Sequence, residues 1–103
     1  MAGYFIAAYD VSDPEAYAQY NPGGMPILMK TMMRHGGKPL VAGPGAEWSA
    51  GERNAVVVIE FPDTDAAHAW LNDPEYVPLK AIRHAATTNR IEIVAPTFVM
   101  PGG

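Results

Sequence analysis

Two acidic residues near the ends of hydrophobic runs are the first candidates for acid–base chemistry. Asp10 ends the run of residues 4–10 (YFIAAYD), and Glu60 lies near the end of the run 54–61 (NAVVVIEF). We expect both runs to be central, parallel neighbouring strands, which places the two carboxylates at the same strand end. Close, partly desolvated carboxylates raise the pKa of at least one of the pair, which can then act as a general acid or base. The structural alternative is that Asp10 caps its turn and Glu60 pairs with an arginine.

Arg83, His35 and Tyr76 are the other candidates for a catalytic role. Arg83 lies beside the apolar side of a helix-like segment, so it could reach a carboxylate such as Glu60 or hold an anionic ligand bidentately. His35 ends another such segment, where it could interact with the helix dipole or act as an acid–base group near neutral pH. Tyr76 follows an acidic cap and could present its hydroxyl group to a ligand. The structural alternative for Arg83 is a solvated side chain or an ordinary ion pair.

Large apolar side chains could line a pocket for a small organic ligand. The candidates are Tyr9, Met29, Trp48 and Trp70. Trp70 also fits a core position. Trp48 lies in a polar, glycine-rich segment, where its ring could cover the pocket or contact another subunit. Met29 belongs to a helical stripe of methionines, whose flexible side chains suit an irregular pocket wall or an ordinary core.

Several kinds of site are not expected. The chain has no cysteine, which excludes disulfides, thiolate nucleophiles and cysteine-based zinc sites. The three histidines show no metal-ligand spacing, so we expect no metal. No glycine-rich phosphate loop or dinucleotide fingerprint is present, so we expect no cofactor.

The charge and hydropathy of the chain also limit its partners. The net charge is −4 and no basic stripe is present, so nucleic-acid binding is not expected. No apolar run approaches the roughly 18–20 residues that a membrane span needs. Residues 1–3 lead directly into strand-like sequence without the features of a signal peptide, so we expect a cytoplasmic protein with no membrane partner.

Alternating strands and helices must position these candidates. Strands are predicted at residues 4–10, 38–42, 54–61 and 89–95. Acidic caps predict helices that begin after Asp13 and at residues 63–64, and Pro78 opens a further short one. A break at residues 21–24 interrupts the first helix. The order β-α-β-β-α-β predicts an α+β, ferredoxin-like antiparallel sheet, with one domain at residues 1–96 and a tail at 97–103.

Both faces of the predicted central strands are apolar. In residues 54–61, Val56 and Val58 point to one face, whereas Val57, Ile59 and Phe61 point to the other. A sheet with one face in water should instead alternate apolar and polar residues. Because the helices cover only one face, we expect a second copy of the chain to cover the other, which makes the protein a homodimer.

A set of short motifs spread over roughly residues 3–95 resembles the DUF1330 family. The motifs are Asp13-Pro14-Glu15-Ala16-Tyr17, His35-Gly36-Gly37-Lys38, Val57-Val58-Ile59-Glu60-Phe61-Pro62, Ala66-Ala67, Trp70, Asp73-Pro74-Glu75-Tyr76, Leu79 and Arg83. The resemblance implies the dimeric α/β barrel fold, which is shared with small cofactor-free monooxygenases, lyases and isomerases. It implies no particular reaction, because the family is named for lacking one.

The sequence therefore supports more than one functional hypothesis. The first is a cofactor-independent enzyme, an isomerase, cyclase, lyase or monooxygenase-like protein acting on a small apolar or aromatic metabolite. In it, Asp10 or Glu60 is the base, Arg83 holds an anion or enolate, and Tyr76 or His35 donates a proton. The alternatives are a non-catalytic ligand-binding protein and a structural dimer.

Overall fold

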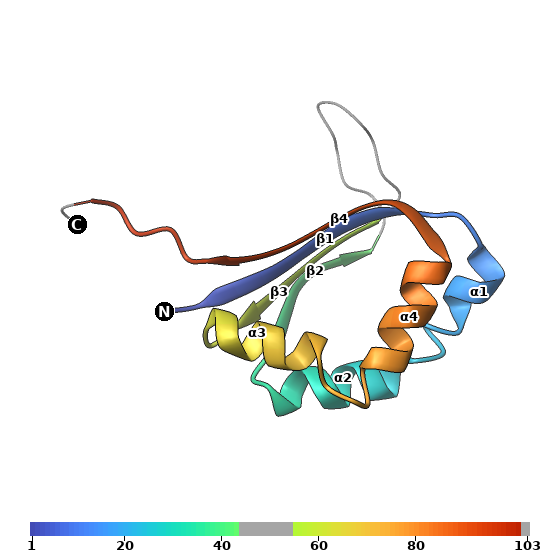
Figure 1. Cartoon of the computed structure of the whole chain (residues 1–103), viewed down its shortest axis with the longest axis horizontal. Coiled ribbons are helices and arrows are strands. Elements are labelled where there is room, and N and C mark those ends of the chain that lie inside the picture. Colours follow the sequence, from blue (N-terminus) through green and yellow to red (C-terminus); the bar gives the residue numbers. More distant parts are fainter. Residues whose placement is uncertain (44–54, 102–103) are drawn as a thin grey trace.

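A four-stranded antiparallel sheet with helices on one face is the frame of the molecule (Figure 1). The computed structural model describes residues 1–43 and 55–101. The strands are β1 (Gly3–Val11), β2 (Lys38–Gly43), β3 (Ala55–Phe61) and β4 (Thr87–Pro96), in the spatial order β2-β3-β1-β4. The helices are α1 (Pro14–Ala18), α2 (Met25–Arg34), α3 (Thr64–Leu71) and α4 (Val77–Ala85). The ferredoxin-like β-α-β-β-α-β order is confirmed, and each helical connection is divided into two helices.

The two central strands, β1 and β3, are antiparallel. Tyr4 lies opposite Glu60, and Tyr9 lies opposite Ala55. The first helical connection returns the chain so that β2 runs in the direction of β1, and β3 then reverses beside β2 and fills the gap between them. The expectation of parallel central strands is therefore wrong. Its consequence is also wrong, because Asp10 and Glu60 lie towards opposite ends of the sheet.

Aspartate caps begin the first helix of each connection. Oδ1 of Asp13 accepts a hydrogen bond from the backbone N–H of Ala16 at 3.1 Å, and Oδ1 of Asp63 accepts one from Ala66 at 2.7 Å. Such caps satisfy backbone donors that a helix leaves free in its first turn. Proline occupies the first turn of α1, α2 and α4, where a missing N–H costs no hydrogen bond. These boundaries agree with the predicted helix starts.

Two glycines end α2. The backbone N–H of Gly37 donates to Met32 at 2.8 Å, and that of Gly36 donates to Met33 at 3.0 Å. Gly36 has a φ of 75°, the left-handed conformation that this end motif requires and that glycine adopts without strain. The chain thus turns sharply from α2 into β2, which brings the whole of α2 under the sheet.

Aromatic rings pack between the sheet and the helices. Trp70 of α3 stacks on Tyr76 with ring centroids 4.1 Å apart, and it makes a T-shaped contact with Phe5 of β1 with ring centroids 5.6 Å apart. Trp70 and Tyr76 are completely or almost completely buried. Such rings contribute large buried apolar area, so they fasten α3 and the α3–α4 connection to the sheet.

No helix or strand of the described residues covers the face of the sheet that points away from the helices (Figure 1). The strand register places Ile6 of β1 opposite Val58 and Ile93, and places Val41 opposite Val58. The side chains of Val41 and Ile93 are 47% and 48% exposed. We call this surface the open face. It agrees with the expectation that both faces of the central strands are apolar and that the helices cover only one.

Residues 97–101 follow β4 and extend away from the sheet (Figure 1). The backbone N–H of Thr97 donates to the carbonyl of Ala2 at 3.0 Å, and the apolar residues Phe98, Val99 and Met100 are exposed. Within the described parts of the chain, no helix combines the length and the hydropathy needed to cross a membrane.

Candidate ligand-binding site

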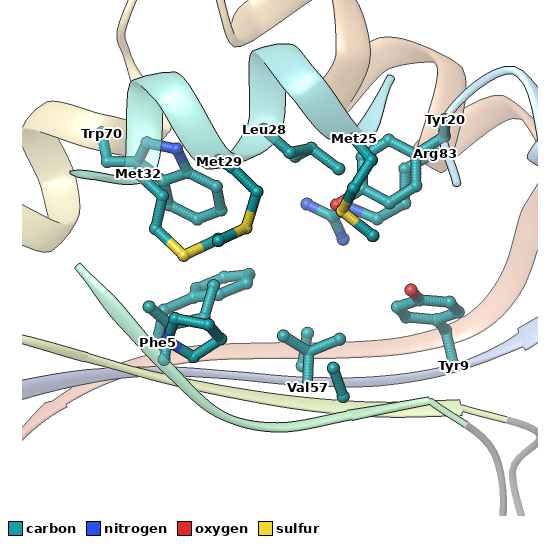
Figure 2. Close-up of a pocket in the computed structure, with 14 residues that line it drawn as sticks. Phe5, Tyr9, Tyr20, Met25, Leu28, Met29, Met32, Val57, Trp70 and Arg83 are labelled. Carbon is teal, nitrogen blue, oxygen red and sulfur yellow. The ribbon is translucent and has the colours of Figure 1, made fainter. Parts of the chain in front are cut away.

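A cavity of about 190 Å³ lies between α2 and the helix-covered face of the sheet (Figure 2). Phe5, Tyr9 and Val57 form part of its floor on β1 and β3. They face the helices because alternate residues of a strand point to the same face. Apart from Arg83, the hydroxyl groups of two tyrosines and the indole of Trp70, the described wall consists of hydrocarbon and methionine side chains. This arrangement suits a mainly apolar ligand.

Helix α2 supplies the opposite wall through a stripe of side chains that points at the sheet (Figure 2). The stripe consists of Met25, Leu28, Met29 and Met32. Residues three and four positions apart lie on one side of a helix, which explains why the stripe is continuous. Leu28 and Met32 are buried, whereas Met25 and Met29 are 38% and 37% exposed and form the rim. Met29 thus lies where the sequence predicted, although its contact with a ligand stays a prediction.

Arg83 brings a buried positive charge to this apolar cavity. The residue is only 1% exposed. Its Nη1 donates to the Glu92 carboxylate, and its Nη2 donates to the Tyr76 hydroxyl at 3.2 Å. Among the residues that the structure describes, Nε has no hydrogen-bond partner. An unpaired buried donor costs free energy, so a native protein usually satisfies it with a protein group, water or a ligand.

Three aromatic rings surround the Arg83 guanidinium. Its central carbon lies 5.8 Å from the ring centroids of Phe5 and Tyr20 and 5.9 Å from that of Tyr9. These distances allow cation–π attraction, which is strongest where water is excluded. Burial lowers the pKa of Arg83, but the neighbouring oxygens of Tyr76, Tyr20 and Glu92 outweigh that effect and raise it. The guanidinium therefore stays charged at the cavity wall.

The tyrosines at the cavity can donate hydrogen bonds but cannot easily act as bases. Burial raises the pKa of the Tyr20 hydroxyl well above its usual range. Burial also raises the pKa of Tyr9, and the contact between its hydroxyl oxygen and that of Tyr17, at 2.6 Å, adds to the shift. Both phenols hence stay protonated at neutral pH.

Tyr76 acts on the cavity through Arg83. Its ring is fully buried against Trp70, and its hydroxyl oxygen accepts the hydrogen bond from Arg83 Nη2. Tyr76 is not among the residues that line the cavity, so the structure places its hydroxyl group against the arginine instead of against a ligand. Its predicted catalytic role is untested, and its observed contact is a positioning one.

Trp70 lines the cavity and is fixed by a buried hydrogen bond. Its Nε1 donates to Oγ1 of Thr31 on α2 at 3.1 Å. The Thr31 hydroxyl in turn donates to the carbonyl of Ile27 at 2.8 Å. The predicted positions of Trp70 and Tyr9 at a pocket wall agree with the structure. Trp48, the fourth predicted ligand-binding residue, lies outside the described residues.

The sequence interpretation did not identify Glu92. This residue of β4 accepts hydrogen bonds from both Arg83 and His84, with His84 Nε2 at 2.8 Å from Oε1. Partial burial raises the pKa of Glu92, but the charge of Arg83 and the hydrogen bonds outweigh it and hold the pKa below its usual range. The sequence did contain a signal for this residue. Glu92 lies two positions before Val94, so the two side chains point to the same face of β4, and Val94 packs against the core. A carboxylate on that face of a strand requires a cationic partner.

The two predicted acid–base residues lie away from the cavity. Asp10 pairs with Thr88 across β1 and β4, and its carboxylate accepts a hydrogen bond from Asn89 at 3.3 Å. Glu60 shares the open face with Val58 and accepts a hydrogen bond from the Tyr4 hydroxyl at 3.2 Å. Neither residue lines the cavity. Arg83 reaches Glu92, not Glu60, because α4 packs on the opposite side of the sheet.

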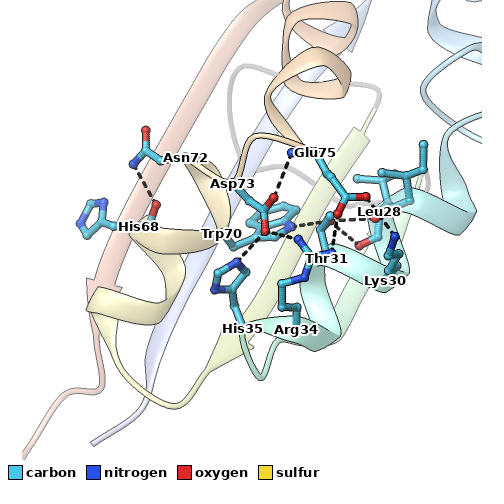
Figure 3. A network of polar contacts seen from close by, with 11 residues as sticks. Leu28, Lys30, Thr31, Arg34, His35, His68, Trp70, Asn72, Asp73 and Glu75 are labelled. Atoms are coloured by element: carbon cyan, nitrogen blue, oxygen red, sulfur yellow. Dashed lines mark hydrogen bonds and ion pairs between the residues drawn. The ribbon is translucent and has the colours of Figure 1, made fainter.

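His35 belongs to a polar network on the outer side of α2 (Figure 3). Its Nε2 lies 2.8 Å from Oδ2 of Asp73, which also accepts a hydrogen bond from Arg34 at 2.8 Å. Lys30 and Arg34 pair with Glu75 at 3.1 and 2.5 Å. This network joins α2 to the α3–α4 connection and lies outside the cavity. The position of His35 at the end of α2 agrees with the sequence, whereas its acid–base role stays a prediction.

No group of three or more histidine, aspartate or glutamate side chains in residues 1–43 and 55–101 is arranged to hold a metal ion. The chemical groups at the cavity are one guanidinium, two phenols, one indole whose N–H is bonded to Thr31, thioethers and hydrocarbon. They can exclude water, enclose an apolar body and donate hydrogen bonds to one oxygen-rich end of it.

Solved structures share this fold. A dimeric ferredoxin-like protein of unknown function from Jannaschia sp. CCS1 is 14% identical, with 94% of this chain and 100% of that chain covered and a TM-score of 0.75. A protein of unknown function from Rhodopseudomonas palustris is 19% identical, with 96% and 84% covered and a TM-score of 0.72. SnoaB, a cofactor-independent oxygenase from Streptomyces nogalater, is 16% identical, with 99% and 98% covered and a TM-score of 0.62. At these identities the similarity shows the fold alone.

The sequence itself identifies the family. No curated protein matches the chain significantly. The model of a family described as a domain of unknown function, DUF1330, matches residues 2–97, and the chain therefore belongs to the DUF1330 family.

Proposed function

We propose that this protein binds a small, mainly apolar or aromatic molecule in the cavity between α2 and the sheet, with Arg83 as its principal polar contact. The observation that carries the proposal is the Arg83 Nε, a buried donor that has no partner within the described residues and belongs to a cavity-lining side chain. A ligand oxygen at this position would satisfy it. The remaining wall would enclose the apolar part of the ligand.

The size of the cavity supports a ligand with about one ring. Many drug-sized ligands occupy pockets of roughly 300–1,000 Å³. An engineered apolar cavity of about 150 Å³ in another protein holds benzene. The cavity here, at about 190 Å³, fits a single substituted ring better than a fused polycyclic molecule.

We further propose that the protein is a homodimer in which the open face of one copy packs against that of another. Two solved structures of similar fold carry the description dimeric and ferredoxin-like. The open face carries the exposed side chains of Val41, Ile91 and Ile93, which a partner would remove from water. Each cavity would then lie on the outer side of a shared pair of sheets.

A second candidate function is a cofactor-independent reaction of the bound molecule, as the description of SnoaB suggests for that protein. Arg83 could stabilise an oxyanion that forms on the ligand. In the described wall, however, no carboxylate or imidazole is present to remove a proton. This composition favours binding over acid–base catalysis as the first proposal.

The cavity is tested with two tryptophan substitutions on the same helix. Met29→Trp replaces a flexible thioether at the rim with a bulky ring, whereas Met33→Trp makes the same change at an exposed methionine that does not line the cavity. Calorimetric titration with acetophenone is expected to show binding to the wild type and to Met33→Trp and little binding to Met29→Trp. Equal binding by all three proteins would place the ligand elsewhere and contradict the proposal.

The dimer is tested by sedimentation at micromolar concentration. Ile93→Lys adds a charge to the open face, and Met33→Lys adds the same charge to the exposed side of α2. We expect the wild type and Met33→Lys to sediment as dimers and Ile93→Lys as a folded monomer. A monomeric wild type, or a dimeric Ile93→Lys, would contradict the pairing of open faces.

The enzymatic alternative is tested with a metabolite extract and mass spectrometry. If a reaction occurs in the cavity, product formation is expected to fall in Arg83→Lys and to persist in Glu60→Gln, because Glu60 lies on the open face. Loss of product in Glu60→Gln alone would instead support the acid–base role that its sequence position predicted. A bound but unchanged molecule would support binding without catalysis.

A further inference from the structure

The charge of Arg83 is already balanced before any ligand enters. Its guanidinium shares a hydrogen bond and an ion pair with Glu92, whose side chain is 27% exposed, against 1% for Arg83. No other acidic or basic side chain lines the described wall of the cavity. The wall therefore carries one cation and, directly behind it, one anion, so its net charge is close to zero.

A carboxylate on the ligand would disturb this balance. It would lose its hydration on entering the cavity, and it would approach the negative charge of Glu92. Burial likewise raises the pKa of Tyr9 and of Tyr20, so it disfavours a negative charge on either phenol at this cavity. A neutral oxygen acceptor avoids both costs.

Each of the two terminal nitrogens of Arg83 already donates one of its N–H groups to a protein partner, and Nε alone of the three nitrogens has no partner within the described chain. A carboxylate is bound best by two parallel donors with free geometry. One carbonyl oxygen needs only one strong donor.

From these contacts we infer that the ligand of this cavity carries a neutral carbonyl group, such as that of an aryl ketone, aldehyde or quinone, and not a carboxylate. Arg83 Nε donates to the carbonyl oxygen, and the methionines and aromatic rings enclose the apolar remainder. The inference rests on the proposed function, because it names the class of molecule for the same cavity.

Three compounds of one size separate the possibilities. Acetophenone carries a neutral carbonyl, benzoate a carboxylate, and isopropylbenzene no acceptor, and all three have the same number of non-hydrogen atoms. Calorimetric titrations are run at about pH 8, where ordinary histidine side chains are neutral. Acetophenone is expected to bind about tenfold more tightly than isopropylbenzene and at least about tenfold more tightly than benzoate.

The Glu92→Gln variant tests the reason for this preference. Glutamine keeps an oxygen that can accept from Arg83 but removes the negative charge, so the guanidinium is no longer balanced. The affinity for benzoate relative to acetophenone is expected to rise about tenfold or more. Glu15→Gln makes the same chemical change on the exposed first turn of α1 and should leave the ratio unchanged.

The outcomes distinguish a wrong ligand class from the absence of ligand binding in the cavity. If benzoate binds the wild type as tightly as acetophenone does, or if Glu92→Gln leaves the ratio unchanged, the carbonyl inference is overturned while the cavity proposal stands. If none of the three compounds binds, or Met29→Trp does not weaken binding, the cavity proposal falls and the inference falls with it.

Discussion

Two helix ends in this protein carry the same adjacent pair, an arginine followed by a histidine, and in each case the pair shares one carboxylate oxygen. At the end of α2, Arg34 and His35 both contact Oδ2 of Asp73. At the end of α4, Arg83 and His84 both contact Oε1 of Glu92. The chemistry is equal, but the burial is reversed.

Burial decides which charged side chain of each group depends most strongly on its partners. In the α2 group the carboxylate is buried, with a 4% exposed side chain, and Arg34 is 40% exposed. In the α4 group the arginine is buried, and the carboxylate is 27% exposed. A buried charge depends on its partners far more than an exposed one, because water cannot replace them. The α2 group therefore joins two helical segments, whereas the α4 group holds a cation against the cavity.

The largest expected difference concerns the two arginines. Arg83→Met removes a fully buried cation and leaves Glu92 partly buried without it, so the free energy of unfolding should fall by about 3–5 kcal/mol. Arg34→Met removes an exposed cation and leaves His35 and the backbone N–H of Glu75 on Asp73. Its effect should be clearly smaller. Urea titrations of the two variants measure both changes.

A paired substitution controls for the packing of Arg83. Arg83→Met combined with Glu92→Leu replaces both charges with apolar groups and is expected to recover much of the lost stability. If Arg34→Met destabilises the protein as much as Arg83→Met does, the exposure of an arginine does not determine how much its ion pair stabilises this fold.

The elements were predictable from sequence because each boundary has a local cause. Asp13 and Asp63 cap helices through their own side chains, and Gly36 ends α2 through its backbone conformation. The apolar open face was likewise visible in the alternation of Val56 and Val58 with their neighbours. The predicted antiparallel sheet also implied that its two central strands run in opposite directions, so the expectation of parallel central strands was inconsistent with the predicted fold.

The candidate site was only partly predictable, since it is assembled by contacts between elements that are distant in sequence. The helical stripe of methionines predicted Met29 as a pocket residue. The position of Arg83 beside the apolar side of its helix predicted that it could reach a carboxylate or a ligand. The pattern of β4 could indicate that Glu92 needs a cation, but not that the cation is Arg83, because the two meet only after β4 takes its register beside β1. Asp10 and Glu60 were predicted to lie close together because each lies near the end of a similar strand. The antiparallel pairing of β1 and β3 places those ends on opposite sides of the sheet.

The pH dependence of stability tests the contribution of Asp73, the buried carboxylate of the α2 group. The hydrogen bond from His35, the backbone N–H of Glu75 and the charge of Arg34 lower the pKa of Asp73 from 3.8 to about 2. A lowered folded-state pKa contributes stability that is fully present above the unfolded-state pKa and is lost as the pH falls towards the folded value. We expect the melting temperature to fall between about pH 4 and pH 2, and to fall less steeply in Asp73→Asn.

A matched variant separates Asp73 from the general effect of acid. Asp65→Asn makes the same change at an exposed position in the first turn of α3 and should keep the wild-type slope. An unchanged slope in Asp73→Asn would mean that its three donors do not stabilise the charged form in the folded protein.

The smallest effect is expected at the outer end of the α2 group. The ammonium of Lys30 lies 3.1 Å from Oε2 of Glu75, but the two side chains are 62% and 45% exposed. Water and salt replace such a pair at little cost, so Lys30→Met should change the melting temperature by no more than about 2 °C. Glu75 keeps its contact with Arg34 in that variant. A larger, salt-sensitive loss would show that the α2 group acts as one cooperative network, and exposure would then be a poor guide to which of its members stabilise the fold.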